Sequence, residues 1–274
     1  MGKRRLDALL AERGLFPSRS RAAASVMAGE VRVGVAERPA QKPGELVDDG
    51  EQLHVAERAA YVSRGGIKLA NALDATGLEV TGRRALDVGA STGGFTDCLL
   101  QRGASAVIAV DVGYGELAWS LRNDPRVTVL ERTNARSLQT KMLPFVGDLA
   151  VIDVSFISLE KVLGAVLGCL APGYDVLAMI KPQFEVGRER VGKGGVVRDP
   201  DTRRSALLSV GRAALSLGAG VVAYASSGLP GPKGNQETFV WLTDPVNASG
   251  DGRGEILTAA GTQQLERLAR EVEP

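Results

Sequence analysis

The chain has 274 residues, of which 44% are hydrophobic and 24% are charged, and its formal net charge is +1. This length suits one large domain with a small second one, and the apolar fraction supports a folded core rather than a disordered chain. No apolar run is long enough to cross a bilayer, and the first ten residues carry charges among their leucines, unlike a secretory signal. We therefore expect a cytoplasmic protein without a membrane span.

The chain has two cysteines and one histidine, which limits the metal sites and catalytic mechanisms that it can have. Cys98 and Cys169 lie far apart in apolar segments, as buried thiols of a reducing compartment do. Because His54 is the single histidine, most metal sites and histidine-based catalytic schemes are excluded. We expect no metal cofactor.

The first part of the chain predicts a small basic α+β domain. Leu6, Leu9 and Leu10 share one helical face, Gly14 stops that helix, and a second helix runs over 18–27. A strand at 31–35, a turn-rich stretch at 42–50 and a closing strand at 53–55 follow. Seven basic and only three acidic residues stand in the first 32 positions, a pattern that suits a nucleic-acid partner and equally a solvated helix face.

This part resembles an S4 RNA-binding domain in Arg5-Leu6-Asp7, Glu12-Arg13-Gly14, Ser18-Arg19-Ser20-Arg21-Ala22 and Gly29-Glu30-Val31-Arg32-Val33. It departs from that family at 34–40, where an Asn-Gly turn is common. The resemblance implies that basic side chains contact structured RNA, and the candidates are Arg4, Arg5, Arg19, Arg21, Arg32 and, later in the chain, Arg64. Arginine contacts to phosphates supply affinity rather than sequence reading.

The stretch 84–97 predicts a strand, a glycine-rich turn and a helix, the place where an α/β sheet presents backbone N–H groups to a ligand. A second buried strand over 106–110 ends in Asp111, roughly twenty residues past Gly89. A carboxylate at that distance suits the two ribose hydroxyls of a nucleoside.

Three ligand hypotheses compete for this turn. Ser91 stands where a dinucleotide fingerprint needs its second glycine, so a pyrophosphate is disfavoured. Residues 89–93 match a G-x-S-x-G nucleophile elbow, but the elbow needs a histidine downstream and His54 lies upstream. A nucleoside cofactor without phosphates, such as S-adenosylmethionine, fits, and an ordinary βα turn is the alternative without function. The predicted cofactor contacts are Asp87, Gly89, Ala90, Ser91, Gly93, Gly94, Phe95, Asp111, Asn134 and Asp153.

Further apolar runs at 127–130, 149–156, 176–184, 221–224 and 237–242 complete a doubly wound α/β sheet of seven mostly parallel strands. Asn134 follows the third strand, and Asp153 and Lys181 terminate the fourth and fifth, where ligands bind in such sheets. A charge at that position is typical of a functional site, with a buried structural ion pair as the alternative.

Methyl transfer to a ribose 2′-hydroxyl needs that hydroxyl in line with the methyl donor and positive charge beside its oxygen. Lysines supply the charge, and carboxylates orient the lysines and limit their repulsion. Lys68, Asp153, Lys181 and Glu237 provide this combination if the strand prediction is right.

These four residues resemble the Lys-Asp-Lys-Glu tetrad of the FtsJ-like ribose 2′-O-methyltransferases. The whole layout resembles more closely the TlyA family of rRNA cytidine 2′-O-methyltransferases, some of which are named haemolysins, through residues 63–69, 86–97, 132–136, 153–159, 180–185, 192–199 and 234–239. The resemblance implies a class I (Rossmann-like) S-adenosylmethionine-dependent methyltransferase fold, with Lys181 as the principal catalytic lysine. It also implies that ribosomal RNA, within ribosomal subunits, is the substrate.

We expect residues 1–58 to form the S4-like domain, 59–63 a linker and 64–270 the methyltransferase domain of a monomer. The basic, glycine-rich loop 193–198 either grips RNA or is a mobile surface loop, and 256–272 predicts an amphipathic helix that packs on the sheet. Two alternatives stay open: a membrane-active haemolysin, which the lack of an amphipathic hairpin run disfavours, and a non-catalytic RNA-binding factor of ribosome assembly. Pseudouridine synthesis is disfavoured because the glycine-rich turn is wrong for it.

Overall fold

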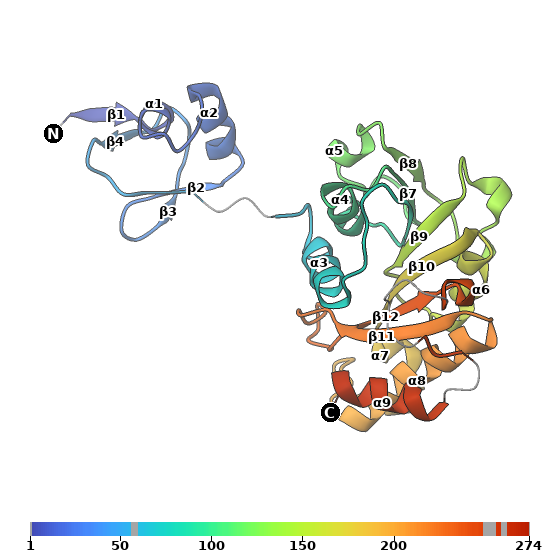
Figure 1. The fold of residues 1–274 in the computed structure, drawn as a ribbon. Helices are drawn as coiled ribbons and strands as arrows, with labels where there is room; N and C mark the ends of the chain where they lie inside the picture. The colour runs from blue at the N-terminus through green and yellow to red at the C-terminus, as the bar shows by residue number, and fades with distance from the viewer. Residues whose placement is uncertain (1, 56–59, 249–255, 259–261, 274) are drawn as a thin grey trace. The chain divides into compact units, whose positions relative to one another are not determined.

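The computed structural model describes residues 2–55, 60–248, 256–258 and 262–273. The chain divides into two compact units, Met1–Ala59 and Ala60–Pro274 (Figure 1). Each unit has hydrophobic core residues of its own. The predicted linker, 59–63, begins at a residue outside the described ones.

The first unit combines two short helices with two small antiparallel sheets. One sheet pairs β1 (Lys3–Arg5) with β4 (Leu46–Asp48), and the other has the order β3 (Arg38–Pro39), β2 (Val31–Val33), β5 (Leu53–Val55). Apolar side chains of α1 (Leu6–Glu12), α2 (Arg19–Met27) and these strands form the core. The second helix begins where predicted because the Ser18 hydroxyl accepts the N–H of Arg21 at 3.2 Å and so caps it.

Two details of this unit differ from the sequence prediction. The strand expected over 31–35 ends at Val33, because Gly34 and Glu37 take φ values of +81° and +49° in a turn that leads into β3. β4 lies inside the stretch predicted to be rich in turns, where no strand was expected. Strands of three residues are too short for an alternating pattern to stand out.

The second unit is built on one sheet of seven strands. Their order is β11 (Gly220–Ser226), β12 (Thr238–Thr243), β10 (Leu170–Ile180), β9 (Gly147–Ile152), β6 (Arg84–Val88), β7 (Ala106–Val110), β8 (Val127–Leu130). The strands from β10 to β8 pair in parallel, whereas β12 is antiparallel to both of its neighbours. This confirms the predicted doubly wound, mostly parallel α/β sheet.

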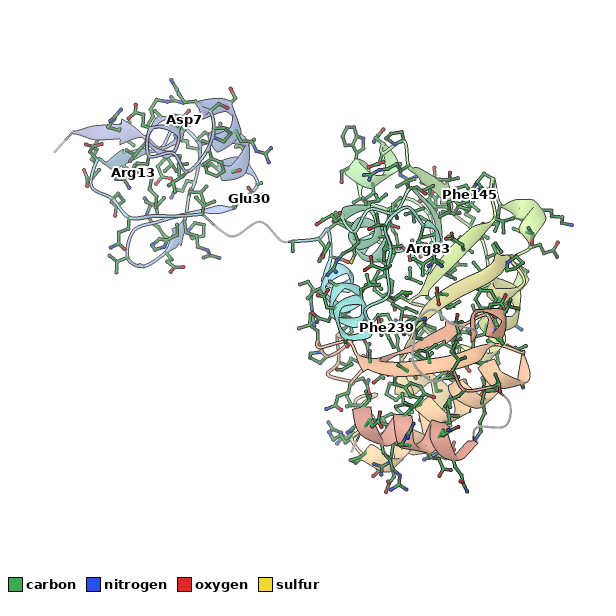
Figure 2. The ribbon with its side chains drawn as sticks, viewed as in Figure 1. Asp7, Arg13, Glu30, Arg83, Phe145 and Phe239 are labelled. Atoms are coloured by element: carbon green, nitrogen blue, oxygen red, sulfur yellow. The ribbon has the colours of Figure 1, made fainter. Side chains whose placement is uncertain are left out.

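Helices cover both faces of this sheet, because strand residues alternate between two buried clusters. Ala85 and Val107 pack with α3 (Arg64–Thr76), α4 (Gly94–Gln101) and α5 (Trp119–Arg122). Leu86 and Ile108 point the other way and pack with α6 (Glu160–Leu167), α8 (Pro200–Ser216) and α9 (Thr262–Val272). Phe239 of β12 is fully buried, and its ring tilts against Phe95 of α4 at a centroid distance of 5.7 Å (Figure 2).

Two predicted elements have different bounds. β10 begins at Leu170 rather than near residue 176, with a register shift against β9 between Leu170 and Asp175. The helix expected over 256–272 is α9, which starts at Thr262, and Leu257 instead forms a β-bridge with Val221. Residues 259–261, within the predicted helix, lie outside the described residues.

The strand order places the ends of three strands together. β6 lies between β7 and β9, which is the point where a doubly wound sheet reverses its order and leaves a crevice for a ligand. Gly89 follows β6, Asp153 follows β9 and Lys181 follows β10. The predicted site residues of these three strands therefore lie at one edge.

Candidate active site

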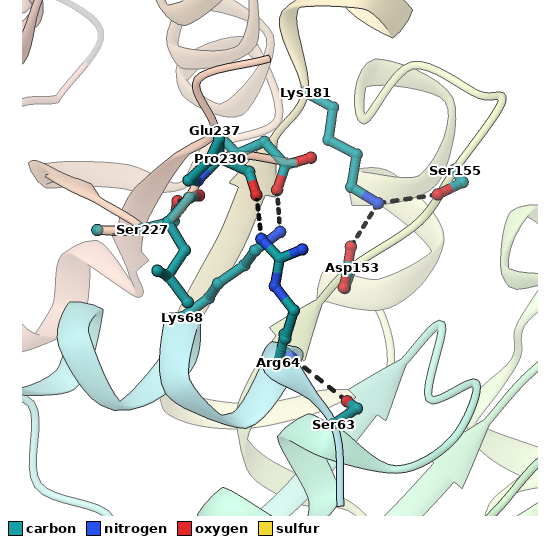
Figure 3. Close-up of polar contacts among 12 residues, drawn as sticks. Ser63, Arg64, Lys68, Asp153, Ser155, Lys181, Ser227, Pro230 and Glu237 are labelled. Carbon is teal, nitrogen blue, oxygen red and sulfur yellow. Dashed lines mark hydrogen bonds and ion pairs between the residues drawn. The ribbon is translucent and has the colours of Figure 1, made fainter. Parts of the chain in front are cut away.

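A cavity of about 1320 Å³ opens at the carboxyl edge of the sheet. All four residues of the predicted tetrad line it, namely Lys68, Asp153, Lys181 and Glu237 (Figure 3). Of the predicted cofactor contacts, Gly89, Ala90, Ser91, Gly94 and Phe95 line it as well. The fold thus gathers residues that lie up to 169 positions apart in the chain.

Lys181 is held by the loop that follows β9. Its Nζ lies 2.6 Å from Asp153 Oδ1 and donates a hydrogen bond to Ser155 Oγ at 2.8 Å (Figure 3). The lysine is 9% exposed, so its stem is buried while its amine faces the cavity wall. A buried structural ion pair was the alternative to a functional site. The Lys181–Asp153 pair is present, but it lines the cavity.

Lys68 and Glu237 form the second pair. The Lys68 amine, on α3, donates to Glu237 Oε2, just before β12, and both residues are buried (Figure 3). The loop beside them passes so closely that a Cβ on Gly231 would lie 2.3 Å from Glu237 Oε1. Arg64 secures the same loop, because its Nη2 donates to the carbonyl of Pro230 at 2.7 Å. Both pairs are therefore positioned by neighbouring loops.

The glycine-rich turn connects the sheet to Asp111. Gly89 has φ +87°, and a Cβ there would lie 2.4 Å from the carbonyl oxygen of Asp153, so only glycine fits. The N–H groups of Ser91 and Gly113 donate to the two oxygens of Asp111 at 2.8 and 2.7 Å. Each oxygen keeps a further lone pair to accept another donor.

Four predicted cofactor residues, Asp87, Gly93, Asp111 and Asn134, are not in the cavity wall. Asp87 lies fully buried below the turn, where Thr96 Oγ1 donates to it at 2.6 Å and burial raises the pKa of its carboxyl to about 7. Asn134 accepts the N–H of Arg136 at 3.0 Å and so caps a short helical turn. This local cap is an alternative to the predicted role of Asn134 as a cofactor contact.

An aromatic pair at the cavity was missed by sequence reasoning. Phe156 is 90% exposed, and its ring lies 5.3 Å, centroid to centroid, from the tilted ring of Phe184. An apolar ring exposed to this extent beside a polar site indicates a binding surface. The available signal was an aromatic residue three positions after Asp153, the carboxylate that follows β9.

The charge of the cavity wall is strongly positive. Its two acidic residues, Asp153 and Glu237, are already paired with lysines. Five further basic side chains line the cavity: Arg64, Arg136, Lys161, Arg188 and Lys233. Only Arg64 was singled out from the sequence, because the others come together only in the folded chain. Such a wall suits a polyanion.

The predicted RNA-binding arginines of the first unit lie on its surface, and several are in ion pairs. Arg5 and Arg19 both contact the buried carboxylate of Asp7, at 2.8 and 3.4 Å. Arg4 pairs with Glu12 and, at 3.5 Å, with Asp49. Arg21 and Arg32 are exposed. Nucleic-acid phosphates would meet exposed guanidinium groups here, some of them already oriented by a carboxylate.

Two further observations concern the described residues alone. No group of three or more histidine, cysteine, aspartate or glutamate side chains among them could hold a metal ion. None of the helices that they form is long and apolar enough to cross a bilayer.

The strand order, the glycine-rich turn and the strand-end carboxylate together define a class I methyltransferase fold, here behind a small α+β unit. Residues 61–244 match the family model of the FtsJ-like methyltransferases, and residues 4–53 match that of the S4 domain. The chain belongs to the FtsJ-like methyltransferases and, by its relatives, to their TlyA family. The predicted family is confirmed.

The relatives cover nearly the whole chain. The 16S/23S rRNA (cytidine-2′-O)-methyltransferase TlyA of Mycobacterium tuberculosis is 51% identical over 91% of this chain and 93% of its own. Hemolysin A of Brachyspira hyodysenteriae is 38% identical over 85% of this chain and 97% of its own. A solved structure from Streptococcus thermophilus, named as a hemolysin, matches with a TM-score of 0.69 and 38% identity over 99% of this chain and 97% of its own.

Proposed function

We propose that this protein transfers a methyl group from S-adenosylmethionine to the 2′-hydroxyl of a cytidine ribose in ribosomal RNA. The observation that supports this most directly is the Lys181 amine, which contacts Asp153 and Ser155 in the wall of a cavity shared with the Lys68–Glu237 pair. A lysine oriented by a carboxylate beside a glycine-rich turn supplies what methyl transfer to a hydroxyl needs.

S-adenosylmethionine fits the residues at the glycine-rich turn. The Asp111 oxygens keep lone pairs for the ribose hydroxyls of the cofactor, and Gly89 and Gly94 line the cavity where its methionine part would lie. Asn134, just past β8, is our proposed adenine contact. When bound, the cofactor supplies an electrophilic methyl group on a sulfonium.

Lys181 is the proposed catalytic lysine. Its amine would lie beside the ribose oxygen and stabilise the negative charge that develops there as the oxygen bonds to the methyl carbon and the hydroxyl proton passes to solvent water. Asp153 and Ser155 hold the amine in one place, so that little reorganisation accompanies the reaction. Lys68 adds positive charge, and Glu237 keeps Lys68 oriented and partly neutralised.

The substrate side of the cavity supports an RNA chain. The exposed Phe156 ring, backed by Phe184, offers a stacking face for an unstacked base. Five basic side chains of the cavity wall do not belong to the tetrad, and these would contact backbone phosphates. The S4 domain would add sequence-independent affinity.

The first experiment is methyl transfer from labelled S-adenosylmethionine to purified ribosomal subunits, with the wild type beside Lys181→Ala. We expect alkali-resistant label in the RNA from the wild type, because a 2′-O-methyl group blocks alkaline cleavage at that position. We expect at least about a 100-fold lower rate for the variant, since it loses the charge beside the reacting oxygen.

Cofactor titration by calorimetry separates the remaining outcomes. Wild-type protein that binds S-adenosylmethionine and RNA but transfers no label to either subunit or to naked rRNA would instead be a non-catalytic RNA-binding factor. Label in bases rather than in ribose would overturn the proposed acceptor while keeping the enzyme a methyltransferase.

A further inference from the structure

The loop between β9 and α6 carries the two groups that contact the Lys181 amine. Asp153 and Ser155 lie 2.6 and 2.8 Å from Lys181 Nζ (Figure 3). The next residue, Phe156, has φ +64°, a backbone conformation that residues with a bulky side chain rarely adopt. Such a conformation persists only where the surrounding structure imposes it.

The far end of this loop is held by Glu185. This residue ends α7 (Pro182–Glu185), the short helix that directly follows Lys181. One of its carboxylate oxygens accepts the Ser158 hydroxyl at 2.7 Å, and the other accepts the N–H of Leu159 at 2.9 Å. Leu159 is itself buried at the start of α6, so the loop is fixed against the core as well.

These contacts close a ring. It runs from Lys181 to Asp153 and Ser155, along the loop to Ser158, across to Glu185, and back through α7 to Lys181. We propose that Glu185 is a positioning residue, which fixes residues 153–159 so that Asp153 and Ser155 meet the Lys181 amine and Phe156 stays exposed at the cavity. The proposal rests on the proposed function, because it concerns the same site.

Three substitutions separate positioning from general stability. Glu185→Ala leaves the Ser158 hydroxyl and the Leu159 N–H without their acceptor. Glu185→Gln keeps the shape, because its carbonyl can accept from Leu159 while its amide donates to the Ser158 oxygen. Glu160→Ala is the matched control: this exposed carboxylate starts α6, but its contact is with Ser209 of α8, at 2.6 Å.

The closing experiment measures steady-state methyl transfer by the full-length chain. For Glu185→Ala we expect kcat to fall by about 100-fold while KM for the cofactor changes by less than about threefold, as for a misplaced reacting group. Glu185→Gln should recover kcat to within about tenfold of the wild type, and Glu160→Ala should match the wild type. A glutamine variant as slow as the alanine variant, or an alanine variant with wild-type kcat, would overturn the proposal.

A second readout needs no activity. Hydrogen exchange of the peptide that contains residues 153–159 should be faster in Glu185→Ala alone, because the Leu159 N–H has lost its acceptor. If the wild type transfers no methyl group, the proposed function fails, and the exchange measurement still decides the role of Glu185.

Should Glu185→Ala not fold, Ser158→Ala removes one of the two contacts and should give a smaller loss of kcat in the same direction. Unchanged exchange in a folded variant would overturn the proposal.

Discussion

Buried charge at the two edges of the same sheet serves different purposes. At the amino edge, Arg83, which is labelled in Figure 2, lies 3.2 Å from the fully buried Asp175. The indole N–H of Trp241 donates to the same carboxylate at 3.0 Å. At the carboxyl edge, Lys181 and Asp153 lie 2.6 Å apart and line a cavity. Arg83 and Asp175 are not in that cavity wall, so access to a ligand is what sets the two ion pairs apart.

Asp87 provides a prediction at this scale, because burial raises the pKa of its carboxyl from 3.8 to about 7. Between these values the folded chain holds a proton that the unfolded chain has lost. The free energy of unfolding should therefore fall as pH rises from about 4 to about 7, by up to about 1.4 kcal/mol per pH unit, and then level off. Asp87→Asn should abolish this slope.

The measurement is urea unfolding followed by tryptophan fluorescence. Both tryptophans, Trp119 and Trp241, belong to the second unit, so the signal reports the unit that contains Asp87. Curves of unfolding free energy against pH that run parallel for the wild type and Asp87→Asn would contradict the raised pKa.

At the scale of elements, two loops that are separate in the sequence, 192–197 and 230–236, both line the cavity. Asn235 is 2% exposed; its oxygen accepts the N–H of Val197 at 2.9 Å, and its amide donates to the Gly195 carbonyl at 2.8 Å. It thereby ties the loop 192–197 to the loop 230–236, beside Glu237. The loop predicted from the sequence either to grip RNA or to be mobile is thus anchored at its carboxyl-terminal end.

Asn235→Ala should free the loop 192–197. Loss of two hydrogen bonds of about 1 kcal/mol each predicts trypsin cleavage after the exposed Lys193 that is about 10- to 30-fold faster. Mass spectrometry of a short digestion of native protein gives the site and the rate.

The matched control is Asn71→Ala. Asn71 also secures a loop next to Glu237, but it donates to the carbonyl of Ser227 at 3.0 Å, which lies outside the loop 192–197. Its loss should leave cleavage after Lys193 at the wild-type rate. Equal acceleration in both variants would mean that the whole site loosens and that Asn235 has no separate anchoring role.

The molecule as a whole divides its charges between two units. The net charge is only +1, but the charges are unevenly distributed: the second unit has a basic cavity wall and the first has exposed arginines. Because phosphate contacts are additive and screened by salt, charges on separate units can act together on one RNA. We expect the first unit to contribute affinity and the second to contribute both affinity and chemistry.

Arg19→Ala/Arg21→Ala tests this division. Loss of two phosphate contacts should reduce the slope of log K against log salt concentration by roughly 2 for ribosomal RNA. Calorimetric binding of S-adenosylmethionine should stay unchanged, because neither arginine lies in the unit that holds the cavity. Arg212→Ala, which removes an exposed arginine of α8 outside the cavity wall, should leave the salt slope unchanged. An unaltered slope in the double variant would exclude these arginines from RNA contact.

Much of the site could be predicted from the sequence because the strands are short, apolar and followed by charges. An apolar run followed by Asp153 or Lys181 predicts both a strand and the position of its carboxyl end. In a parallel sheet the carboxyl ends of the strands lie at one edge. The predictions failed where the pattern was weak, as in the three-residue β4, or interrupted, as at the register shift of β10.

The sequence by itself determined the fold class, the family, and which residue types stand at the strand ends, because these depend on local periodicity and on motifs within a few residues. Only the tertiary structure decided that Lys68 pairs with Glu237 and that Glu185 returns to the loop before α6. Such contacts join residues far apart in the chain. Side-chain direction and loop packing, which no local pattern encodes, determine whether they form.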